Sequence, residues 1–275
     1  MIEFENVSYC YEDDKKVLED ITIKIEDGDF VGIIGHTGSG KSTLIQMMNG
    51  LLKPDTGTIK YNGKNIFENG YDLRELKFHV GVVFQYPDYQ LFETTVLKDV
   101  MYGPLNMGMT QNQAMEAAKN ALNLVGISDE KFKKSPFELS GGEKKKVSIA
   151  GILAMNPEVL VLDEPVAGLE PEGRRNLLKM LEKIRKENNI TIVMVSHSME
   201  NVADYCNHVI VMNDGKLELN GTPEDVFMQA EKLEKMGLSS TLAYYIMREL
   251  QNRGIVTDNK TITMKEAYAC LEKLL

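Results

Sequence analysis

The segment GHTGSGKST (35–43) has the residue types and the spacing of a loop that binds phosphate. It matches the pattern G-x-x-x-x-G-K-[ST], and it lies between an apolar run and a helical pattern that begins at Lys41. Glycines allow backbone N–H groups to curl around a phosphate, the Lys41 ammonium can reach the β- and γ-phosphates, and the Ser42 hydroxyl can ligate Mg²⁺. The segment therefore predicts a nucleotide site with contacts from Gly35, His36, Thr37, Gly38, Ser39, Gly40, Lys41, Ser42 and Thr43.

An acidic pair ends the apolar run in VLVLDEP (159–165). An acid at the carboxyl end of a parallel strand faces the crevice in which ligands bind. Asp163 is therefore suited to hold Mg²⁺, and Glu164 is suited to accept a proton from an attacking water.

The stretch LSGGEKKKVSIA (139–150) places a serine and two glycines directly before a helical pattern. The free N–H groups at the start of a helix favour an anion, so this stretch is a second candidate for phosphate contact. The three lysines at 144–146 fit either a helix start that faces phosphate or a solvated face, and we favour the solvated face for their side chains.

The composition makes several classes of protein improbable. The net charge of −10 and the pI of about 5.1 disfavour nucleic acid as a partner, because a phosphate backbone requires a basic surface. The three cysteines are far apart, which argues against a disulfide framework or a zinc site. No apolar run approaches the roughly 18 residues of a membrane span, so a function at a membrane would require another chain to supply the span.

Periodicity in the first part of the chain predicts strands followed by a helix. Residues 1–35 alternate between apolar and polar side chains, as strands do. A helical pattern over 41–52 is expected to end before Pro54, and Asn62-Gly63 predicts the turn of a hairpin.

Periodicity in the rest of the chain predicts an α/β fold with a parallel sheet. The spacing of apolar residues over about 90–155 is mostly that of helices. Two wholly apolar strands, 159–163 and 190–196, then flank a helix at roughly 171–188, as is typical of parallel sheets.

The phosphate loop, LSGG and LDEP, in this order, resemble the ATPase subunit of an ATP-binding cassette (ABC) protein over about residues 1–225. The resemblance implies a P-loop NTPase fold, with a RecA-like core, an antiparallel β subdomain and an α-helical subdomain at about 90–155. A small C-terminal helical extension would follow over 226–275. The resemblance also implies ATP and Mg²⁺ as ligands. The γ-phosphate of ATP held by a second subunit would contact Ser140, Gly141 and Gly142.

The resemblance assigns roles to further positions. Tyr11 matches the aromatic residue that stacks on adenine, with Tyr9 as the competing choice. Gln85 matches the glutamine that senses Mg²⁺ and the lytic water, and His197 matches the histidine that contacts the γ-phosphate. The implied catalytic residues are Glu164, His197 and Gln85, the implied Mg²⁺ residues are Ser42, Gln85 and Asp163, and the implied dimer-interface loop contains Gly168, Leu169 and Glu170.

Three positions depart from the family pattern. Glu170 stands where the family usually has Asp, Glu143 where it often has Gln, and Val166 where it often has Thr. The longer Glu170 side chain would alter communication between the two sites or slow turnover. Glu143 suits the helix dipole, yet it places a carboxylate near a phosphate from the second subunit. Because no residue of the phosphate loop or the acidic pair is lost, we still expect ATPase activity.

The segments GHTGSGKST, VFQYPDYQLFETTV and LAMNPEVLVLDEPVAGLEP most resemble the energy-coupling factor class of importers for vitamins and transition-metal ions. Thr37 after His36 favours the second of the two paralogous ATPases in that class. The implied partners are a second ATPase subunit (a paralogue or a second copy), a transmembrane coupling subunit docked on the loop from Asp88 to Glu93, and a separate membrane subunit that binds the substrate. The implied location is the cytoplasmic face of the cell membrane. The C-terminal helices would either help the ATPases to dimerise or cover the sheet.

Other classes of protein remain as alternatives. The ATPase of a different ABC importer or exporter would carry the same core motifs. A soluble ABC protein acting on ribosomes or DNA is disfavoured by the single cassette and the acidic charge. A regulatory nucleotide binder without hydrolysis would require an idle Glu164.

Overall fold

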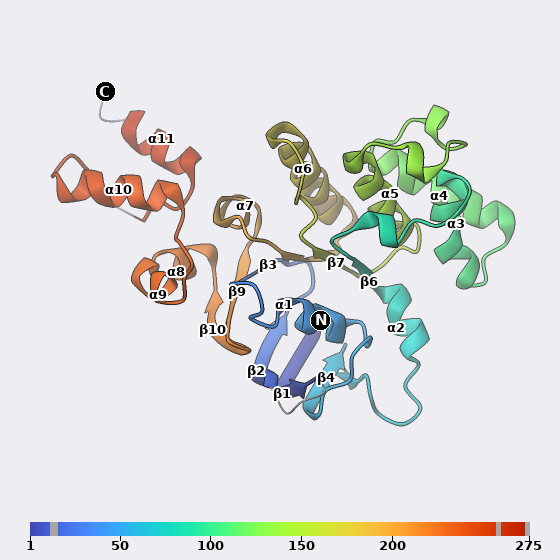
Figure 1. Cartoon of the computed structure of the whole chain (residues 1–275), viewed down its shortest axis with the longest axis horizontal. Helices are drawn as coiled ribbons and strands as arrows, with labels where there is room; N and C mark the ends of the chain where they lie inside the picture. The colour runs from blue at the N-terminus through green and yellow to red at the C-terminus, as the bar shows by residue number, and fades with distance from the viewer. Residues whose placement is uncertain (12–15, 257–259, 273–275) are drawn as a thin grey trace.

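A central six-stranded sheet organises the part of the chain that the computed structural model describes, residues 1–11, 16–256 and 260–272 (Figure 1). The strand order is β10-β9-β3-β8-β7-β6, and only the pair of β9 and β10 is antiparallel among the described residues. The strands are β3 (Phe30–Ile34), β6 (Val80–Val83), β7 (Val159–Asp163), β8 (Thr191–Val195), β9 (His208–Asn213) and β10 (Lys216–Gly221).

The register of this sheet brings the carboxyl ends of four parallel strands to one edge. Val195 of β8 pairs with Ile33 of β3 on one side and with Asp163 of β7 on the other. Val83 of β6 pairs with Leu162 of β7. The segments that follow these strands are the phosphate loop, the acidic pair and the segments that carry Gln85 and His197, so the topology gathers them at this edge.

Both faces of the sheet are buried, as the apolar strands predicted. Alternate residues such as Leu160 and Ile192 face one apolar core, and their neighbours Val161 and Val193 face another. Each such aliphatic side chain contributes about 1.5–3 kcal/mol on burial, which makes the sheet a rigid base for the loops at its edge.

A second, antiparallel sheet closes one of these cores in the order β2-β1-β4-β5. Its strands are β1 (Ile2–Cys10), β2 (Lys16–Ile25), β4 (Thr56–Tyr61) and β5 (Lys64–Asn65). The predicted Asn62-Gly63 turn joins β4 to β5, and both residues have positive φ. Helix α1 (Lys41–Met48) packs in the same core and ends earlier than expected, because Gly50 turns the chain with a φ of 71° before Pro54 is reached.

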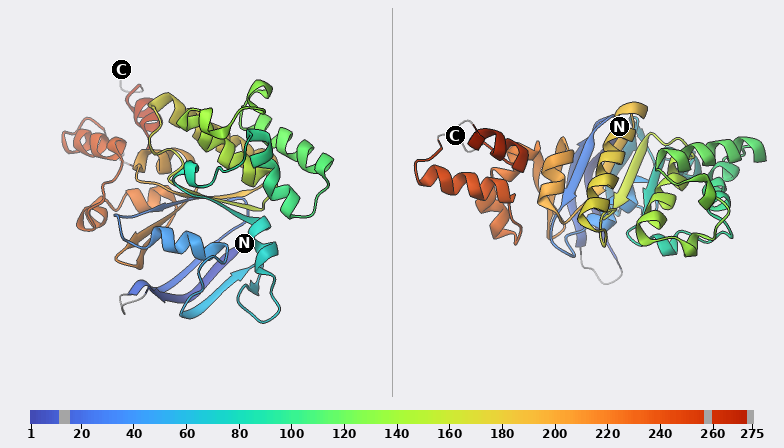
Figure 2. Two further views of the ribbon diagram at one scale, coloured as in Figure 1. Left: turned by 45° about the vertical axis from the view of Figure 1, so that its right-hand side comes forward. Right: turned by 90° about the horizontal axis from the view of Figure 1, so that it is seen from above.

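The predicted helical unit is present at one end of the molecule (Figure 2). Helix α4 begins with the expected capping box between Thr110 and Gln113. A Cβ on Gly81 of β6 would lie 2.1 Å from Ile152, so glycine lets α5 approach the sheet. Helix α2 (Leu73–His79) precedes β6 and packs in the core that the antiparallel sheet closes. The elements of the helical unit are η1 (Pro87–Tyr89), α3 (Val96–Asn106), α4 (Gln111–Leu124), η2 (Asp129–Lys131), η3 (Pro136–Glu138) and α5 (Gly141–Leu153).

The remaining helices lie over the sheet and at the opposite end of the molecule (Figures 1 and 2). Phe227 and Leu233 join the main core, whereas Met247 and Ala267 belong to a small separate core. The division of the chain at residue 225 stays a prediction. The helices are α6 (Pro171–Asn188), α7 (Met199–Tyr205), α8 (Pro223–Phe227), α9 (Ala230–Lys235), α10 (Leu242–Asn252) and α11 (Met264–Glu272). Within the described ranges, none of the helices has both the length and the apolar character needed to cross a membrane.

Candidate active site

The phosphate loop joins β3 to α1 and its shape depends on glycine. A Cβ on Gly35 would lie 2.3 Å from the Met212 carbonyl oxygen and 2.6 Å from the Ser39 hydroxyl. Ser39 is fully buried, and it does not line the cavity in front of the loop. The His36 ring lies 3.4 Å from Asp214 Oδ1, which ties the loop to the turn between β9 and β10. The tight packing fixes the path of the loop around the cavity in front of it.

Lys41 holds the loop from inside. Its Nζ donates to the carbonyl oxygens of Gly35 and His36, both at 2.8 Å. Burial lowers the pKa of Lys41, and the nearby carboxylates of Glu164 and Asp163 oppose that shift. The ammonium is thus already at the base of the loop, where the β- and γ-phosphates of a nucleotide would lie.

A cavity of about 490 Å³ opens in front of the loop. It brings together residues that are far apart in the sequence, and Val17 of β2 completes its wall. The residues lining it include Thr37, Gly38, Gly40, Lys41, Ser42, Thr43, Gln85, Glu164 and His197. A cationic, glycine-rich wall opposite a carboxylate and an imidazole suits a triphosphate whose terminal phosphoryl group is attacked by water.

Glu164 is held between two of the predicted catalytic side chains. Gln85 Nε2 donates to Glu164 Oε2 at 3.0 Å, and His197 Nε2 lies 2.9 Å from Glu164 Oε1. Glu164 has a φ of 48°, a left-handed conformation that is uncommon for a residue with a side chain. This turn carries the carboxylate from the end of β7 into the cavity.

Ser42 and Asp163 form an oxygen pair that fits Mg²⁺. The Ser42 hydroxyl donates to Asp163 Oδ2 at 3.4 Å. Burial raises the pKa of Asp163, and the neighbouring Glu164 carboxylate raises it further. A partly desolvated carboxylate beside a hydroxyl is the hard-oxygen environment that Mg²⁺ prefers, and a cation there would favour the ionised form of Asp163. Gln85, the third residue predicted to hold Mg²⁺, donates a hydrogen bond to Glu164 in this arrangement.

The two candidate aromatic residues have different surroundings. The Tyr11 hydroxyl lies 3.3 Å from Thr43 Oγ1 in α1, and the Tyr11 side chain is 47% exposed. Tyr9 packs against the apolar core, and its ring contacts Tyr11 edge to face at 4.9 Å. The geometry therefore favours Tyr11 as the ring that a nucleotide base would meet.

Ser140, Gly141 and Gly142, here called the signature residues, begin the signature helix α5 and do not line the cavity of their own chain. Ser140 caps α5, and its hydroxyl and backbone N–H both donate to Glu143 Oε2, at 2.9 Å and 3.0 Å. Lys131 of η2 forms an ion pair with the other oxygen of Glu143, so the unexpected carboxylate is neutralised within this chain. The hydrogen bond from Lys131 is the main cause that lowers the pKa of Glu143 to about 2.

The predicted interface loop lies between the acidic pair and α6. Gly168 has a φ of 73°, and the Leu169 side chain packs against the backbone of Gly142 in α5. Glu170 occupies the N-cap position of α6, but its side chain accepts no hydrogen bond from the first turn. Asp at this position has the shorter side chain that capping favours, so the departure from the family pattern has a local structural consequence.

Two lysines near the signature were not assigned a site role from the sequence. Lys131 pairs with Glu143, and Lys145 Nζ donates to the carbonyl oxygens of Ala167 at 2.6 Å and Glu164 at 3.4 Å. The expectation of a solvated face is therefore wrong for Lys145. Neither contact has a signal in the sequence, because each joins segments that meet only in the folded chain.

Asp99 of α3 was also missed. Its carboxylate is nearly buried and accepts from the backbone N–H groups of Phe92 and Glu93, at 3.0 Å and 2.8 Å. Burial raises its pKa. An acid in the first turn of a predicted helix was the available signal, since such residues often bind free N–H groups. Asp99 thereby shapes the loop that follows Gln85.

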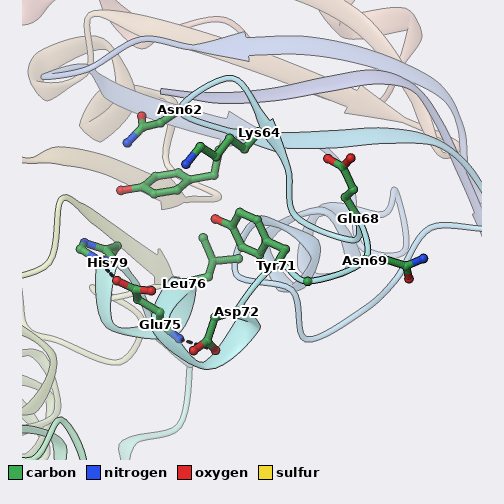
Figure 3. Close-up of a pocket in the computed structure, with 11 residues that line it drawn as sticks. Asn62, Lys64, Glu68, Asn69, Tyr71, Asp72, Glu75, Leu76 and His79 are labelled. Atoms are coloured by element: carbon green, nitrogen blue, oxygen red, sulfur yellow. Dashed lines mark hydrogen bonds and ion pairs between the residues drawn. The ribbon is translucent and has the colours of Figure 1, made fainter.

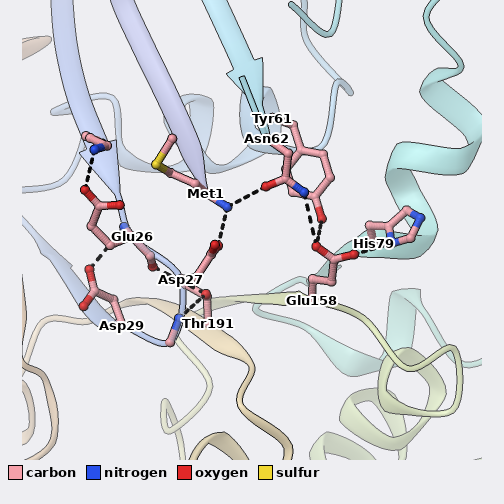
Figure 4. Close-up of polar contacts among 11 residues, drawn as sticks. Met1, Glu26, Asp27, Asp29, Tyr61, Asn62, His79, Glu158 and Thr191 are labelled. Atoms are coloured by element: carbon pink, nitrogen blue, oxygen red, sulfur yellow. Dashed lines mark hydrogen bonds and ion pairs between the residues drawn. The ribbon is translucent and has the colours of Figure 1, made fainter. Parts of the chain in front are cut away.

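A second hollow, of about 500 Å³, lies between the β4–β5 hairpin and α2 (Figure 3). Tyr61, Tyr71 and His79 line it, and none of the predicted site residues does. Beside it, Tyr61 donates to Glu158 at 2.5 Å, and His79 Nδ1 lies 3.1 Å from the same carboxylate (Figure 4). These contacts join the antiparallel sheet to the start of β7, so we assign them a structural role.

Sequence comparison identifies the family of the chain. Residues 18–167 match the family described as ABC transporter. The energy-coupling factor transporter ATP-binding protein EcfA2 of Caldanaerobacter subterraneus subsp. tengcongensis is 49% identical over 270 residues, which cover 97% of this chain and 94% of that protein. EcfA2 of Clostridium perfringens is 46% identical over 100% of this chain and 98% of its own length.

Solved structures give the same result. The structure of cbiO1 from Clostridium perfringens, described as part of the ABC transporter complex cbiONQ, aligns with a TM-score of 0.77 and 40% identity over 85% of this chain and 93% of its own. The ATP-binding cassette MJ0796, solved as a dimer in a post-hydrolysis state with ADP and Pi, aligns with a TM-score of 0.71 and 27% identity over 81% and 99% of the two chains. The fold is that of an ABC ATPase. The chain belongs to the ABC transporter family and, within it, to the ATP-binding proteins of energy-coupling factor transporters.

Proposed function

We propose that this chain binds and hydrolyses ATP to power an energy-coupling factor transporter that takes up vitamins or transition-metal ions. The observation that carries the proposal is the Glu164 carboxylate, which is oriented by Gln85 and His197 at the wall of the cavity that the phosphate loop lines. A carboxylate placed in this way suits the activation of water beside a terminal phosphate.

Some residues of the site bind ATP, and others activate the attacking water. The backbone of the phosphate loop and Lys41 bind the phosphates of ATP, and Tyr11 stacks on the base. Glu164 accepts a proton from the water that attacks the γ-phosphorus, while His197 donates a hydrogen bond to the γ-phosphate and Gln85 helps to position the water. Ser42 and Asp163, with Gln85, would hold Mg²⁺, which when bound neutralises charge on the phosphate oxygens. Most of the rate acceleration then comes from the positioning of the reactants and from the charges placed around the γ-phosphate.

A second ATPase subunit completes each site. Ser140, Gly141 and Gly142 lie at the start of α5 and do not line the cavity of their own chain. We infer that they bind the γ-phosphate of ATP held by the partner, which is either a paralogue or a second copy. The loop at 168–170 then crosses the interface between the two subunits.

A transmembrane coupling subunit would dock beside the loop that follows Gln85. Tyr89 in this loop is 86% exposed, and Tyr86 and Phe92 are also exposed. Next to them, a cavity of about 240 Å³ is lined by Phe92, by Tyr102 of α3 and by residues of α2 and α5. Exposed aromatic side chains beside an apolar hollow are typical of a surface that binds another protein. Docking of this kind would hold the chain at the cytoplasmic face of the cell membrane.

The C-terminal helices would contribute to dimerisation. The beginning of this segment covers the main core through Phe227 and Leu233, but α10 and α11 pack mainly on each other. Met264 and Tyr268 of α11 remain exposed, at 51% and 70%. The substrate itself would be bound by a separate membrane subunit.

The proposal is tested by purification of the tagged chain from solubilised membranes of its native organism, with co-purifying proteins identified by mass spectrometry. We expect a polytopic membrane protein, a second related ATPase and a small membrane protein that identifies the cargo. Recovery of ribosomal or DNA-repair proteins without any membrane protein would contradict the transport function and leave the ATPase function in place.

A further inference from the structure

Lys145 connects the signature residues, which would contact ATP of the partner subunit, to Glu164, which faces ATP bound by its own chain. It lies in α5, one turn after the signature residues, and its ammonium donates to the carbonyl oxygens of Ala167 at 2.6 Å and Glu164 at 3.4 Å. We propose that Lys145 is a positioning residue for Glu164 and that it couples the signature helix to the turn at residues 164–167 of the same chain, here called the catalytic turn. The proposal rests on the ATPase function proposed above.

The catalytic turn requires such support because its backbone is unusual. Glu164 has a left-handed φ of 48°, and the turn is closed by a hydrogen bond from the Ala167 N–H to the Glu164 carbonyl at 3.1 Å. Both carbonyl oxygens therefore converge on the single Lys145 ammonium. Residues held in uncommon backbone conformations persist only where their surroundings fix them, and here Lys145 supplies a charged donor.

The position of Lys145 also allows a movement of α5 to be transmitted to the catalytic turn. Its side chain is half-buried between α5 and the catalytic turn, and Leu169 of the following loop packs against Gly142 at the start of α5. Burial lowers the pKa of Lys145, whereas the Glu164 carboxylate favours the charged form. A movement of α5 when Ser140 binds a phosphate of the partner would therefore shift the backbone that aims Glu164 at the nucleotide of its own chain.

The test compares three variants of the full chain in its assembled transporter complex. Lys145→Met removes the donor and keeps the apolar part of the side chain. Lys145→Arg keeps a charged donor. Lys146→Met is the matched control, because Lys146 is the next residue of α5 and its ammonium lies near Gly126 instead. The measured quantities are kcat and KM for ATP, the affinity for a fluorescent ATP analogue, and the melting temperature.

We expect Lys145→Met to lower kcat by about tenfold or more, because small displacements of a catalytic group have large effects on rate. KM and nucleotide affinity should remain within about twofold of wild type, since the phosphate loop is untouched. Lys145→Arg should retain most of the activity, and Lys146→Met all of it.

A Lys145→Met variant with wild-type kcat would overturn the proposal, as would a parallel loss of kcat and nucleotide affinity. If Lys145→Met does not assemble, Lys145→Gln, which keeps an uncharged donor on a shorter side chain, is judged by the same two criteria. Absence of ATP hydrolysis in the wild-type complex would instead contradict the proposed function, so the two failures are distinguishable.

Discussion

His197 Nε2 lies 2.9 Å from Oε1 of Glu164, and the two residues follow neighbouring parallel strands, β8 and β7. Gln85, which follows β6, donates to the other oxygen of the same carboxylate. The carboxylate is thus oriented by two side chains of its own chain. Such preorganisation lowers the cost of reaching the reactive geometry, because the orientation is already present in the fold.

The tight packing of the phosphate loop is tested by Gly35→Ala. The added methyl group would meet the Met212 carbonyl at 2.3 Å, so the loop must shift. We expect the free energy of unfolding to fall by about 1–3 kcal/mol and ATP binding to be lost, as measured by urea unfolding and nucleotide titration. Gly108→Ala is the control, because Gly108 also has positive φ but has open space around its Cβ position. Wild-type ATP affinity in Gly35→Ala would refute this account of the loop.

The choice between Tyr11 and Tyr9 is tested by alanine substitution of each. Tyr11→Ala should weaken ATP binding by roughly 1–3 kcal/mol, the usual contribution of stacking on a base. Tyr11→Phe keeps the ring and loses only the contact with Thr43, so its affinity should stay close to wild type. Isothermal titration calorimetry provides the affinities. The assignment fails if Tyr9→Ala weakens binding without loss of stability while Tyr11→Ala binds normally.

The pair of Glu143 and Lys131 predicts a pH-dependent contribution to stability. The pKa of Glu143 is lowered to about 2 in the folded chain, from a usual value of 4.5. A lowered pKa means that the contribution is present above the unfolded value and is lost as pH falls from 4.5 toward 2. Glu143→Gln should therefore reduce the free energy of unfolding at pH 7, by about 1 kcal/mol or less for a partly exposed pair.

The pH dependence is measured by urea unfolding of wild type and Glu143→Gln between pH 7 and pH 3. The difference between the two proteins should be constant down to about pH 5 and should then shrink. A difference that grows with acid would show that the pair does not lower the pKa of Glu143.

The uncapped start of α6 predicts a stabilising substitution. Glu170→Asp shortens the side chain at the N-cap, so its carboxylate can accept from the backbone N–H groups of the first turn. We expect an increase of about 0.5–1 kcal/mol in the free energy of unfolding, measured by calorimetry, with ATP binding retained. Glu170→Ala is the comparison, and it should show no gain. Equal stability of wild type and Glu170→Asp would mean that the longer side chain costs nothing at this position.

The parts of this molecule that were predicted from the sequence are those with local patterns. The apolar strands, the capping box at Thr110 and the Asn62-Gly63 turn each follow from a few adjacent residues, and the sheet topology then places Glu164 beside the phosphate loop. The end of α1 was misjudged, because Pro54 is the more conspicuous signal although Gly50 already turns the chain.

The contacts that escaped prediction are tertiary. Lys145 reaches Ala167, and Lys131 reaches Glu143, across segments whose proximity depends on how α5 packs against the sheet and the surrounding loops. A lysine on a helix surface has the same local pattern whether it is solvated or bonded. Only the folded arrangement distinguishes the two cases.

The central claim, that Glu164 activates water beside an ATP bound at the phosphate loop, is tested most directly by single-turnover hydrolysis in the assembled complex with Glu164→Gln. The substitution keeps the shape of the side chain and removes the base. We expect ATP affinity to be retained and the rate of hydrolysis to fall by about 10²–10⁴-fold, the usual contribution of a general base. Hydrolysis at the wild-type rate in this variant would contradict the account.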